Sequence, residues 1–335
     1  MPLTGLQVDL VWNKGVAALC DRRIPDEFAD GQNYSPISSY AGALISSKIP
    51  DNLIPEPSAF HDLANGEIVW VRLSWLRSFI RQVLPWVKNQ FILVTADSDT
   101  CVPSELKGEA RAILNCPNVL HWYTQNYDGS LASAKISPVP IGIDFHSLSE
   151  GFIWKENAST PTQQEQALRS IRLKLAPPEK RIPDVYLDFA WRRGWGIRDY
   201  RRFHPLKGTS LRDSRRTVAA KLRKKERVFC QSGPLARNEM WRRRGEYAFV
   251  LSPHGTGLDC HRTWEALALG HIVLVPSSSL DSLFDGLPVI PLKNWSDITP
   301  ESLDKWLSLY PHGASDDERL TSRYWINRMR SLLAN

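Results

Sequence analysis

The sequence predicts an α/β protein of two domains, each built on a doubly wound parallel sheet. Three observations predict this class. Short apolar runs alternate with segments of helical periodicity over residues 1–150 and again over residues 184–310, a pattern that favours parallel sheets. The length of 335 residues suffices for two separate cores. Residues 151–183 include a stretch rich in Ser, Thr, Pro and Gln and are expected to connect the domains.

The elements follow from these periodicities. In the first domain, apolar runs predict strands at residues 6–11, 91–95, 119–122 and 139–143, and Leu73, Leu76 and Ile80 predict a helix within residues 70–86. In the second domain, strands are predicted at residues 185–189, 227–230, 247–251, 271–275 and 288–291. Helices are predicted at residues 163–175, 210–225 and 259–269 and from Pro300 onward, with residues 311–335 as a separate helical segment.

Composition excludes several classes of protein. With 42% hydrophobic and 23% charged residues, the chain is neither disordered nor fibrous. No apolar run approaches the ~20 residues of a membrane span, and Asp9 and Lys14 interrupt the N-terminal apolar stretch where a secretory signal would be uncharged. We therefore expect a cytoplasmic protein, with peripheral association with a membrane left open. The five cysteines include no Cys-x-x-Cys pair, so neither a disulfide framework nor a zinc cluster is indicated.

The positive charge is concentrated in one segment. The net charge is +6, but residues 191–227 hold fourteen Lys or Arg against three acidic residues, a local excess of +11, so the remainder sums to −5. Interleaved Trp191 and Trp195 would suit a binding module for single-stranded nucleic acid or an acidic glycan. No nucleic-acid-binding motif accompanies them, so we interpret the segment as attracting an anionic substrate and expect no nucleic acid partner. The six basic residues at 212, 215, 216 and 223–225 are expected on a solvated helix face.

The most informative stretch runs from residue 247 to residue 275. An apolar strand leads into a loop with Gly255 and Gly257, and a helix then opens near Asp259. The unpaired amides and the dipole at such a helix start favour an anion such as phosphate. Arg262 could hold a diphosphate and Glu265 the hydroxyls of a ribose. The structural alternative is that Asp259 caps the helix while Arg262 and Glu265 pair with each other.

The same stretch resembles a known family. Leu251-Ser-Pro-His-Gly, Asp259, Arg262-Thr-Trp-Glu-Ala-Leu and Gly270-His-Ile-Val-Leu-Val are similar to the nucleotide-sugar half of exostosin-like glycosyltransferases, which have the GT-B fold of two Rossmann-like domains facing a central cleft. The resemblance covers residues 247–291. Val273 departs from the family pattern, which has proline at that position.

The resemblance implies transfer of a hexosyl or pentosyl group from a nucleotide-diphosphate sugar to a hydroxyl of a glycan or glycoconjugate. It implies no bound metal and no cofactor, because protein dipoles and cations stabilise the departing diphosphate. It also implies a donor site in which Glu265 binds the ribose and Arg262 lies with the 254–257 loop at the phosphates. The expected donor-binding residues are His254, Gly255, Thr256, Gly257, Asp259, His261, Arg262, Glu265, Ser277 and Ser278, with Arg192, Arg193 and Arg198 of the basic segment.

The first domain is expected to supply the acceptor side and a catalytic base. Asp97 and Asp99 follow one predicted strand, and Asp144 and His146 follow another. Asp97-Ser-Asp99 also matches a metal-binding Asp-x-Asp pattern, although aspartates capping a turn before Pro103 explain it more simply. Asp144 is the better placed base, with a turn cap as its structural alternative. Gln125 and Asn126 are expected to line the acceptor side with His146.

Tryptophans are sorted by their neighbours. Trp122, Trp191, Trp195 and Trp295 lie near predicted loops and are candidates for sugar contacts, whereas Trp70, Trp75, Trp264 and Trp306 are expected in the core. Two other functions stay open. One is a GT-B-type sugar-nucleotide epimerase, which would convert a donor without an acceptor, and the other is the non-catalytic binding module described above.

Overall fold

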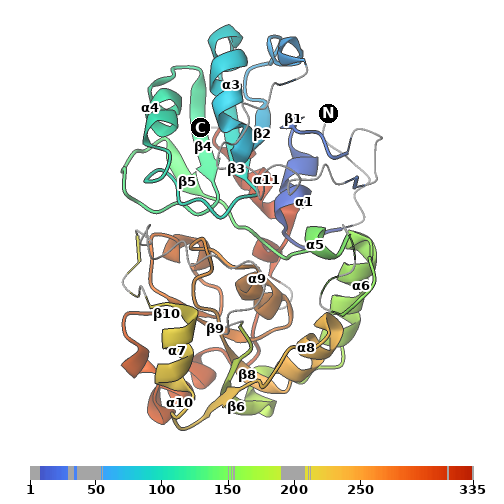
Figure 1. The fold of residues 1–335 in the computed structure, drawn as a ribbon, viewed down its shortest axis with the longest axis vertical. Coiled ribbons are helices and arrows are strands. Elements are labelled where there is room, and N and C mark those ends of the chain that lie inside the picture. The colour runs from blue at the N-terminus through green and yellow to red at the C-terminus, as the bar shows by residue number, and fades with distance from the viewer. Residues whose placement is uncertain are drawn as a thin grey trace. The chain divides into compact units, whose positions relative to one another are not determined.

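The computed structural model describes residues 8–28, 34–35, 54, 56–149, 151, 153, 155–189, 208–209, 211, 213–314 and 317–333. The chain divides into two compact units. Residues Met1–Ile141 and Thr321–Asn335 form the first unit, and residues Gly142–Leu320 form the second. Each unit contains one five-stranded sheet in which every pairing is parallel (Figure 1), so the predicted α/β class with two parallel sheets is confirmed.

The first sheet has its strands in chain order, β1-β2-β3-β4-β5. Its strands are β1 (Arg22–Ile24), β2 (Ile68–Arg72), β3 (Phe91–Ala96), β4 (Val119–Thr124) and β5 (Ile136–Pro138). Every residue of β2 and β3 is buried, as expected for central parallel strands covered on both faces. The helices of this unit are α1 (Asn13–Leu19), α3 (Leu76–Gln82), α4 (Lys107–Asn115) and α11 (Ser322–Ser331), with 3₁₀ turns at Pro57–Phe60, Leu73–Trp75 and Leu84–Trp86.

The last helix completes the first unit. In Figure 1 the red α11 lies beside the blue α1, although some 300 residues of chain separate them. The amide of Ser322 donates to the carbonyl of Asp9, and Trp325, Ile326 and Met329 are buried. A Cβ on Gly15 of α1 would lie 2.7 Å from Oγ of Ser322, so the glycine permits this close approach.

The second sheet has the order β10-β9-β8-β6-β7. Its strands are β6 (Ile182–Leu187), β7 (Val228–Cys230), β8 (Tyr247–Leu251), β9 (Ile272–Pro276) and β10 (Val289–Leu292). From β6 the chain adds β7 on one side and then β8 on the other. The strand order therefore reverses between β6 and β8, and in doubly wound sheets ligands bind beyond the carboxyl ends of the strands at such a reversal.

Six helices accompany the second sheet among the described residues. They are α5 (His146–Ser149), α6 (Pro161–Arg172), α7 (Arg215–Leu222), α8 (Arg237–Arg244), α9 (His261–Ala268) and α10 (Pro300–Leu309), with 3₁₀ turns at Pro178–Lys180, Asp281–Phe284, Trp295–Asp297 and Glu318–Leu320. Apolar side chains of β6, β8 and β9 form the centre of the core, and Val218 and Leu222 of α7 pack against them.

Several predicted elements differ from the observed ones. Trp70 belongs to β2 rather than to the predicted helix, because β2 is buried on both faces and its apolar run carries no strand-like alternation. In the described part of the predicted strand at 6–11, Leu10 makes a single bridge, to Thr321. The strand predicted at 139–143 is found at Ile136–Pro138. Residues 151–183, expected to connect two domains, carry α6 within the second unit.

Within the part of the chain that the structure describes, no helix combines the length and the apolar character that crossing a bilayer requires.

Candidate functional site

The reversal of strand order in the second sheet brings two loops together. Asp188 directly follows β6, and residues 252–260 join β8 to α9. This β8–α9 loop is the predicted phosphate loop, and it lies where the topology alone places a ligand site.

Hydrogen bonds to buried groups hold the loop in place. His254 is buried, and its ring nitrogens lie 2.7 Å from the carbonyl oxygen of Leu258 and 2.8 Å from Oγ1 of Thr209. Nε of Arg215, the first residue of α7, donates to the carbonyl of His254 at 3.0 Å. A Cβ on Gly255 would lie 3.1 Å from Nη2 of Arg215, so the glycine lets the guanidinium approach the backbone. The side chain of Arg215 therefore contacts this loop, and the prediction that it lies on a solvated helix face is wrong.

The N-terminus of α9 lacks a side-chain cap. Its N-cap residue is Cys260, whose side chain accepts no hydrogen bond from the first turn. Asp259 does not cap the helix. Both of its carboxylate oxygens accept from Nε1 of Trp264 at 3.0 Å, and Oδ1 also accepts from the amide of Cys260. The first turn of α9 is thus left with donors that no side chain satisfies, which is the condition for anion binding at a helix start.

Asp188 anchors two arginines. It accepts from Nη2 of Arg244 at 2.6 Å and from Nε of Arg262 at 2.8 Å. Burial would raise the pKa of Asp188, but the two guanidinium groups outweigh it and hold the pKa below its ordinary value. Arg262 therefore pairs with Asp188 and not with Glu265. Among the described residues, Nη1 and Nη2 of Arg262 have no hydrogen-bond partner.

Glu265 lies in the same network. Its Oε1 accepts from Nη2 of Arg237 at 3.1 Å, and its Oε2 accepts from Nη1 of Arg244 and Nε1 of Trp241, each at 3.3 Å. The guanidinium of Arg237 also stacks on the ring of Trp241, 4.5 Å from its centroid. A carboxylate has about four acceptor positions, so three protein donors leave Glu265 about one for a ligand.

The network carries a net positive charge. Arg237, Arg244 and Arg262 supply three positive charges, while Asp188 and Glu265 supply two negative charges, which leaves +1, and Arg215 contacts the neighbouring loop. Burial and the neighbouring Arg215 and Arg244 lower the pKa of Arg262 despite the opposing effect of Asp188. An anion bound between Arg215 and Arg262 would relieve their mutual repulsion, so the arrangement suits a diphosphate.

Two cavities border the network. The larger, of about 410 Å³, lies between α6 and α8, and Arg237, Trp241 and Gln164 form part of its wall. Its volume is in the range of small-molecule sites, and most of its lining residues are polar. The smaller, of about 10 Å³, is lined in part by His254, Asp259 and Ser278 and holds no more than one water molecule.

The other residues predicted to bind the sugar donor either contact other groups of the protein or lie outside the residues that the structure describes. Oγ of Ser277 and the amide of Ser278 both donate to the carboxylate of Asp281, at 2.7 Å and 2.8 Å. Thr256 is exposed and Gly257 is buried within the loop. Arg192, Arg193 and Arg198 lie outside the described residues, as do Trp191 and Trp195.

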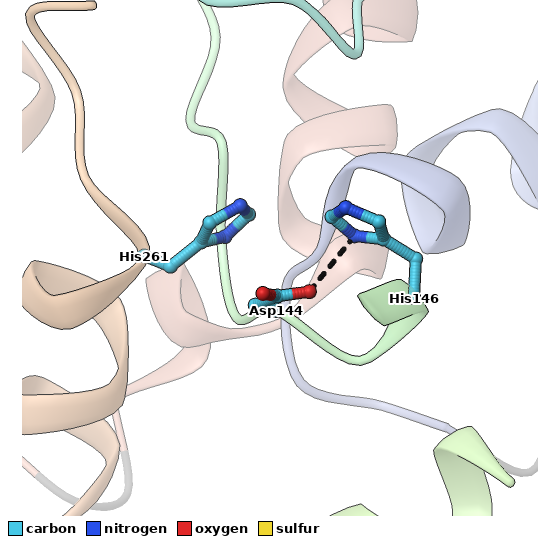
Figure 2. Close-up of side chains that lie close together, drawn as sticks. All are labelled: Asp144, His146 and His261. Atoms are coloured by element: carbon cyan, nitrogen blue, oxygen red, sulfur yellow. Dashed lines mark ion pairs between the residues drawn. The ribbon is translucent and has the colours of Figure 1, made fainter. Parts of the chain in front are cut away.

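A second group of polar side chains gathers in the second unit. Asp144, His146 and His261 each offer a ligand atom, and these atoms lie within 4.8 Å of one another (Figure 2). Oδ1 of Asp144 lies 3.1 Å from Nδ1 of His146 and accepts from the amide of Ser147 at 3.0 Å, so Asp144 also caps α5. Burial would raise the pKa of Asp144, but His146, His261 and Arg237 hold it well below the usual range. The carboxyl group is therefore ionised at neutral pH.

Asp97 lies in a buried charge network of the first unit. It pairs with Lys14 and with Nε of Arg72 at 2.7 Å, and it accepts from Nδ2 of Asn13 at 3.0 Å. Glu27 completes the network, 2.6 Å from Nζ of Lys14 and 2.6 Å from Nη2 of Arg72. Two cations thus neutralise Asp97, while Asp99 is exposed. The carboxylate of Asp97 is therefore already occupied by Lys14 and Arg72.

The predicted acceptor-side residues of the first unit support this network. Gln125 accepts from the amide of Asp97 at 3.0 Å and donates to the carbonyl of Ser98 at 2.8 Å. Asn126 donates to the same carbonyl at 2.9 Å. Both side chains are buried, so they hold the loop after β3 in shape. The role of Lys14 could not be predicted, because its burial on a short helix is not visible in a local sequence pattern.

Most of the tryptophans that the structure describes are buried. Trp122 is fully buried and donates to Oγ1 of Thr95 at 2.9 Å, so its prediction as a sugar contact is wrong. Trp295 is buried and donates to Asp213 at 2.6 Å. Trp70 and Trp264 lie in the core as expected.

The chain was compared with protein families, curated proteins and solved structures. No protein-family model matches the chain, and no curated protein matches it. The solved structures to which it is similar include E. coli "Trehalose-6-phosphate" bound with UDP-2-fluoro glucose, at 10% identity over 80% of this chain and 74% of that chain with a TM-score of 0.36. Another is OtsA without ligand, at 10% identity over 83% and 75% with a TM-score of 0.37. A third is an alpha-glucosyltransferase in complex with UDP-glucose and DNA containing an abasic site, at 11% identity over 84% and 78% with a TM-score of 0.30.

Proposed function

We propose that the chain is a GT-B-type glycosyltransferase that transfers a sugar from a nucleotide-diphosphate sugar to a hydroxyl of a glycan or glycoconjugate. The observation that carries the proposal is the network with a net charge of +1, beside Arg215, at the strand-order reversal of the second sheet. A loop containing Gly255 and an uncapped helix start adjoin that network. All three features favour a diphosphate at the same edge of the sheet.

Each residue of the network has a proposed role. Arg215 and Arg262 bind the two phosphates, and the amides at the start of α9 add hydrogen bonds to them. Glu265 holds Arg237 and Arg244 in place and offers its remaining acceptor position to a ribose hydroxyl. Because guanidinium groups offset the negative charge that develops on the leaving diphosphate, the donor needs no metal ion at this position. His254, Asp259, Ser277 and Ser278 shape the loops around it.

Asp144 is the residue we propose near the acceptor hydroxyl. Its carboxyl group is ionised and lies beside two imidazoles, so the cluster has groups that accept a proton. A carboxylate with a strongly lowered pKa is a weak base by itself. We therefore propose that the acceptor hydroxyl binds beside this cluster and donates a hydrogen bond to the carboxylate of Asp144.

The donor site is tested by comparing two adjacent arginines of α7. Arg215→Gln removes the guanidinium beside Gly255, and we expect it to weaken the binding of UDP, GDP or ADP, whichever binds the unaltered chain most tightly, about 10-fold to 100-fold. Calorimetric titration of the full-length chain measures this affinity. A preceding thermal-shift screen of nucleotides and nucleotide sugars identifies the nucleotide, because a ligand that binds only the folded state raises the melting temperature.

Arg216→Gln is the matched control. Arg216 follows Arg215 on the same helix but is exposed, so its substitution changes the overall charge equally and should alter the affinity by less than about 2-fold. The donor proposal is wrong if no nucleoside diphosphate binds the unaltered chain. Equal losses in the two variants would also contradict it, because general electrostatic attraction would then explain the binding.

A further inference from the structure

The group formed by Asp144, His146 and His261 has the composition and geometry of a metal site. All three residues belong to the second unit and lie at the start of α5 or of α9. Asp144 is buried, and the two histidines are partly buried. The fold by itself does not account for two imidazoles beside one carboxylate.

The hydrogen bonding of His261 determines which ring nitrogen is available. Nδ1 lies 2.7 Å from the carbonyl oxygen of Gly142, and a carbonyl only accepts, so Nδ1 carries the proton. In the neutral ring, which is the form that binds a metal, Nε2 then carries the lone pair. Histidines that bind a metal commonly donate their other ring N–H to a backbone carbonyl in this way, which fixes the tautomer and the ring orientation.

His146 and Asp144 face each other without a hydrogen bond between them. Figure 2 shows Nδ1 of His146 directed at Asp144, with Oδ1 of the carboxylate 3.1 Å away. The atom Nδ1 is buried, yet it has no hydrogen-bond partner among the described residues. Two atoms bound to one tetrahedral zinc ion at about 2.1 Å lie about 3.4 Å apart. The observed separation of 3.1 Å is slightly shorter.

The arrangement of the two imidazole rings agrees with the same ion. A zinc ion on a ring lone pair lies about 3.2 Å from the ring centroid, so two imidazoles on one tetrahedral ion have centroids about 5.2 Å to 5.5 Å apart. The centroids of His146 and His261 are 5.5 Å apart. One ring nitrogen of each histidine and one carboxylate oxygen of Asp144 lie within 4.8 Å of one another, so binding one ion requires side-chain rotations that bring these atoms to a spacing of about 3.4 Å.

We propose that Asp144, His146 and His261 bind one Zn²⁺ ion. Two imidazole nitrogens and one carboxylate oxygen suit zinc and disfavour magnesium or calcium, which take oxygen ligands. Three protein ligands leave a fourth position for water, as in catalytic rather than structural zinc sites. This site is separate from the donor diphosphate, and its existence does not depend on the proposed transfer reaction.

The test is a zinc titration of the full-length chain after treatment with a chelator. We expect one equivalent of Zn²⁺ to bind, measured by competition with a chromogenic chelator, and Co²⁺ to give visible absorption bands of a site with nitrogen and oxygen ligands. His146→Ala and His261→Ala should each weaken zinc binding at least about 100-fold. Asp144→Asn retains an acceptor for the amide of Ser147 and should weaken it about 10-fold to 100-fold without unfolding the chain.

His312→Ala is the matched control. The side chain of His312 is 77% exposed and lies outside the cluster, so its removal should change the zinc affinity by less than about 2-fold. Failure of the unaltered chain to bind an equivalent of zinc at micromolar concentration would overturn the proposal. Zinc binding that persists in both histidine variants would also overturn it, because cysteines or other groups would then be the ligands.

Discussion

At the scale of single residues, both units bury charged side chains and neutralise them in networks. Lys14 and Arg72 share Glu27 and Asp97 in the first unit, while Arg244 and Arg262 share Asp188 in the second. An unpaired buried charge costs several kcal/mol, so each member depends on the others. The two networks differ in net charge. The first is neutral, whereas the second has more arginines than carboxylates, so only the second is proposed to bind an anion.

Asp188→Asn tests the second network through its pH dependence. Because the folded pKa of Asp188 is below its unfolded value of about 3.9, the carboxylate stabilises the chain above that pH, and the stabilisation is lost as the pH falls through the folded pKa. At pH 7 we expect Asp188→Asn to lower the free energy of unfolding by about 3–5 kcal/mol. Below pH 4 the difference between variant and unaltered chain should shrink. Urea denaturation from pH 7 to pH 3 measures both effects.

Asp304→Asn supplies the comparison, because Asp304 also pairs with an arginine, Arg227, but its side chain is 69% exposed. Its substitution should cost less than about 1 kcal/mol. A gap between Asp188→Asn and the unaltered chain that stays constant down to pH 3 would show that the ion pairs do not cause it.

The residues of the donor site illustrate how far the sequence reaches. Arg262 and Glu265 stand in a recognisable pattern, and the structure places both in the network at the expected loop. Their partners could not be predicted, because Asp188 lies 74 residues from Arg262 along the chain, and tertiary pairing of this kind leaves no local periodicity. For the same reason Arg215 was assigned to solvent, although its guanidinium donates to the loop.

At the scale of elements, the ends of two helices in the second unit contrast. Helix α6 has Pro161 in its first turn and a capping box in which Thr160 and Gln163 satisfy each other's backbone amides. Helix α9 has no side-chain cap. The first amides of α6 are satisfied by side chains of the same segment. The first amides of α9 have no side-chain acceptor, and they are the ones proposed to bind phosphate.

Thr160→Ala should destabilise α6 by about 1 kcal/mol, because the amide of Gln163 loses its acceptor. Hydrogen exchange of the α6 amides measures the opening free energy of this helix without unfolding the rest of the chain. Thr160→Ser keeps the hydroxyl and should leave exchange close to that of the unaltered chain. If the serine variant exchanges as fast as the alanine variant, the cap does not hold the helix.

The sequence predicted the strands of the second sheet better than its helices. Strand β8 is found at Tyr247–Leu251, as predicted, because a fully apolar run between polar segments marks a buried strand. Helix α8 was missed. Its sequence, Arg-Asn-Glu-Met-Trp-Arg-Arg-Arg, has little apolar periodicity, because Arg237 and Arg244 occupy buried positions that hydrophobic residues usually fill. Ion pairs of Arg237 with Glu265 and of Arg244 with Asp188 offset the cost of burying these two arginines.

At the scale of the whole molecule, the first unit is assembled from both ends of the chain. Its sheet is formed by residues before 141, but α11 packs on α1 and brings Trp325, Ile326 and Met329 into the core. The sequence predicts this helix but not where it packs, because amphipathic periodicity shows that one face is buried and does not show which element covers it.

Deletion of residues 321–335 should therefore destabilise the first unit. Three buried apolar side chains contribute about 5 kcal/mol or more, and the bonds from Ser322 to Asp9 and Leu10 are lost with them. We expect faster hydrogen exchange in α1 and β1, while amides of β8 in the second unit keep their protection. Unchanged protection of α1 in the shortened chain would refute this.

The division of the chain into two units also determines which unit is completed first during translation. The second unit is inserted into the first, since the chain leaves the first unit at Ile141 and returns to it at Thr321. A ribosome releases domains from the N-terminus onward, and most domains fold as they emerge. Here the N-terminal unit lacks α11 until the entire second unit has been synthesised. The second unit is therefore the first that is complete, and the nascent N-terminal unit exposes the apolar surface of α1 until translation reaches the last helix.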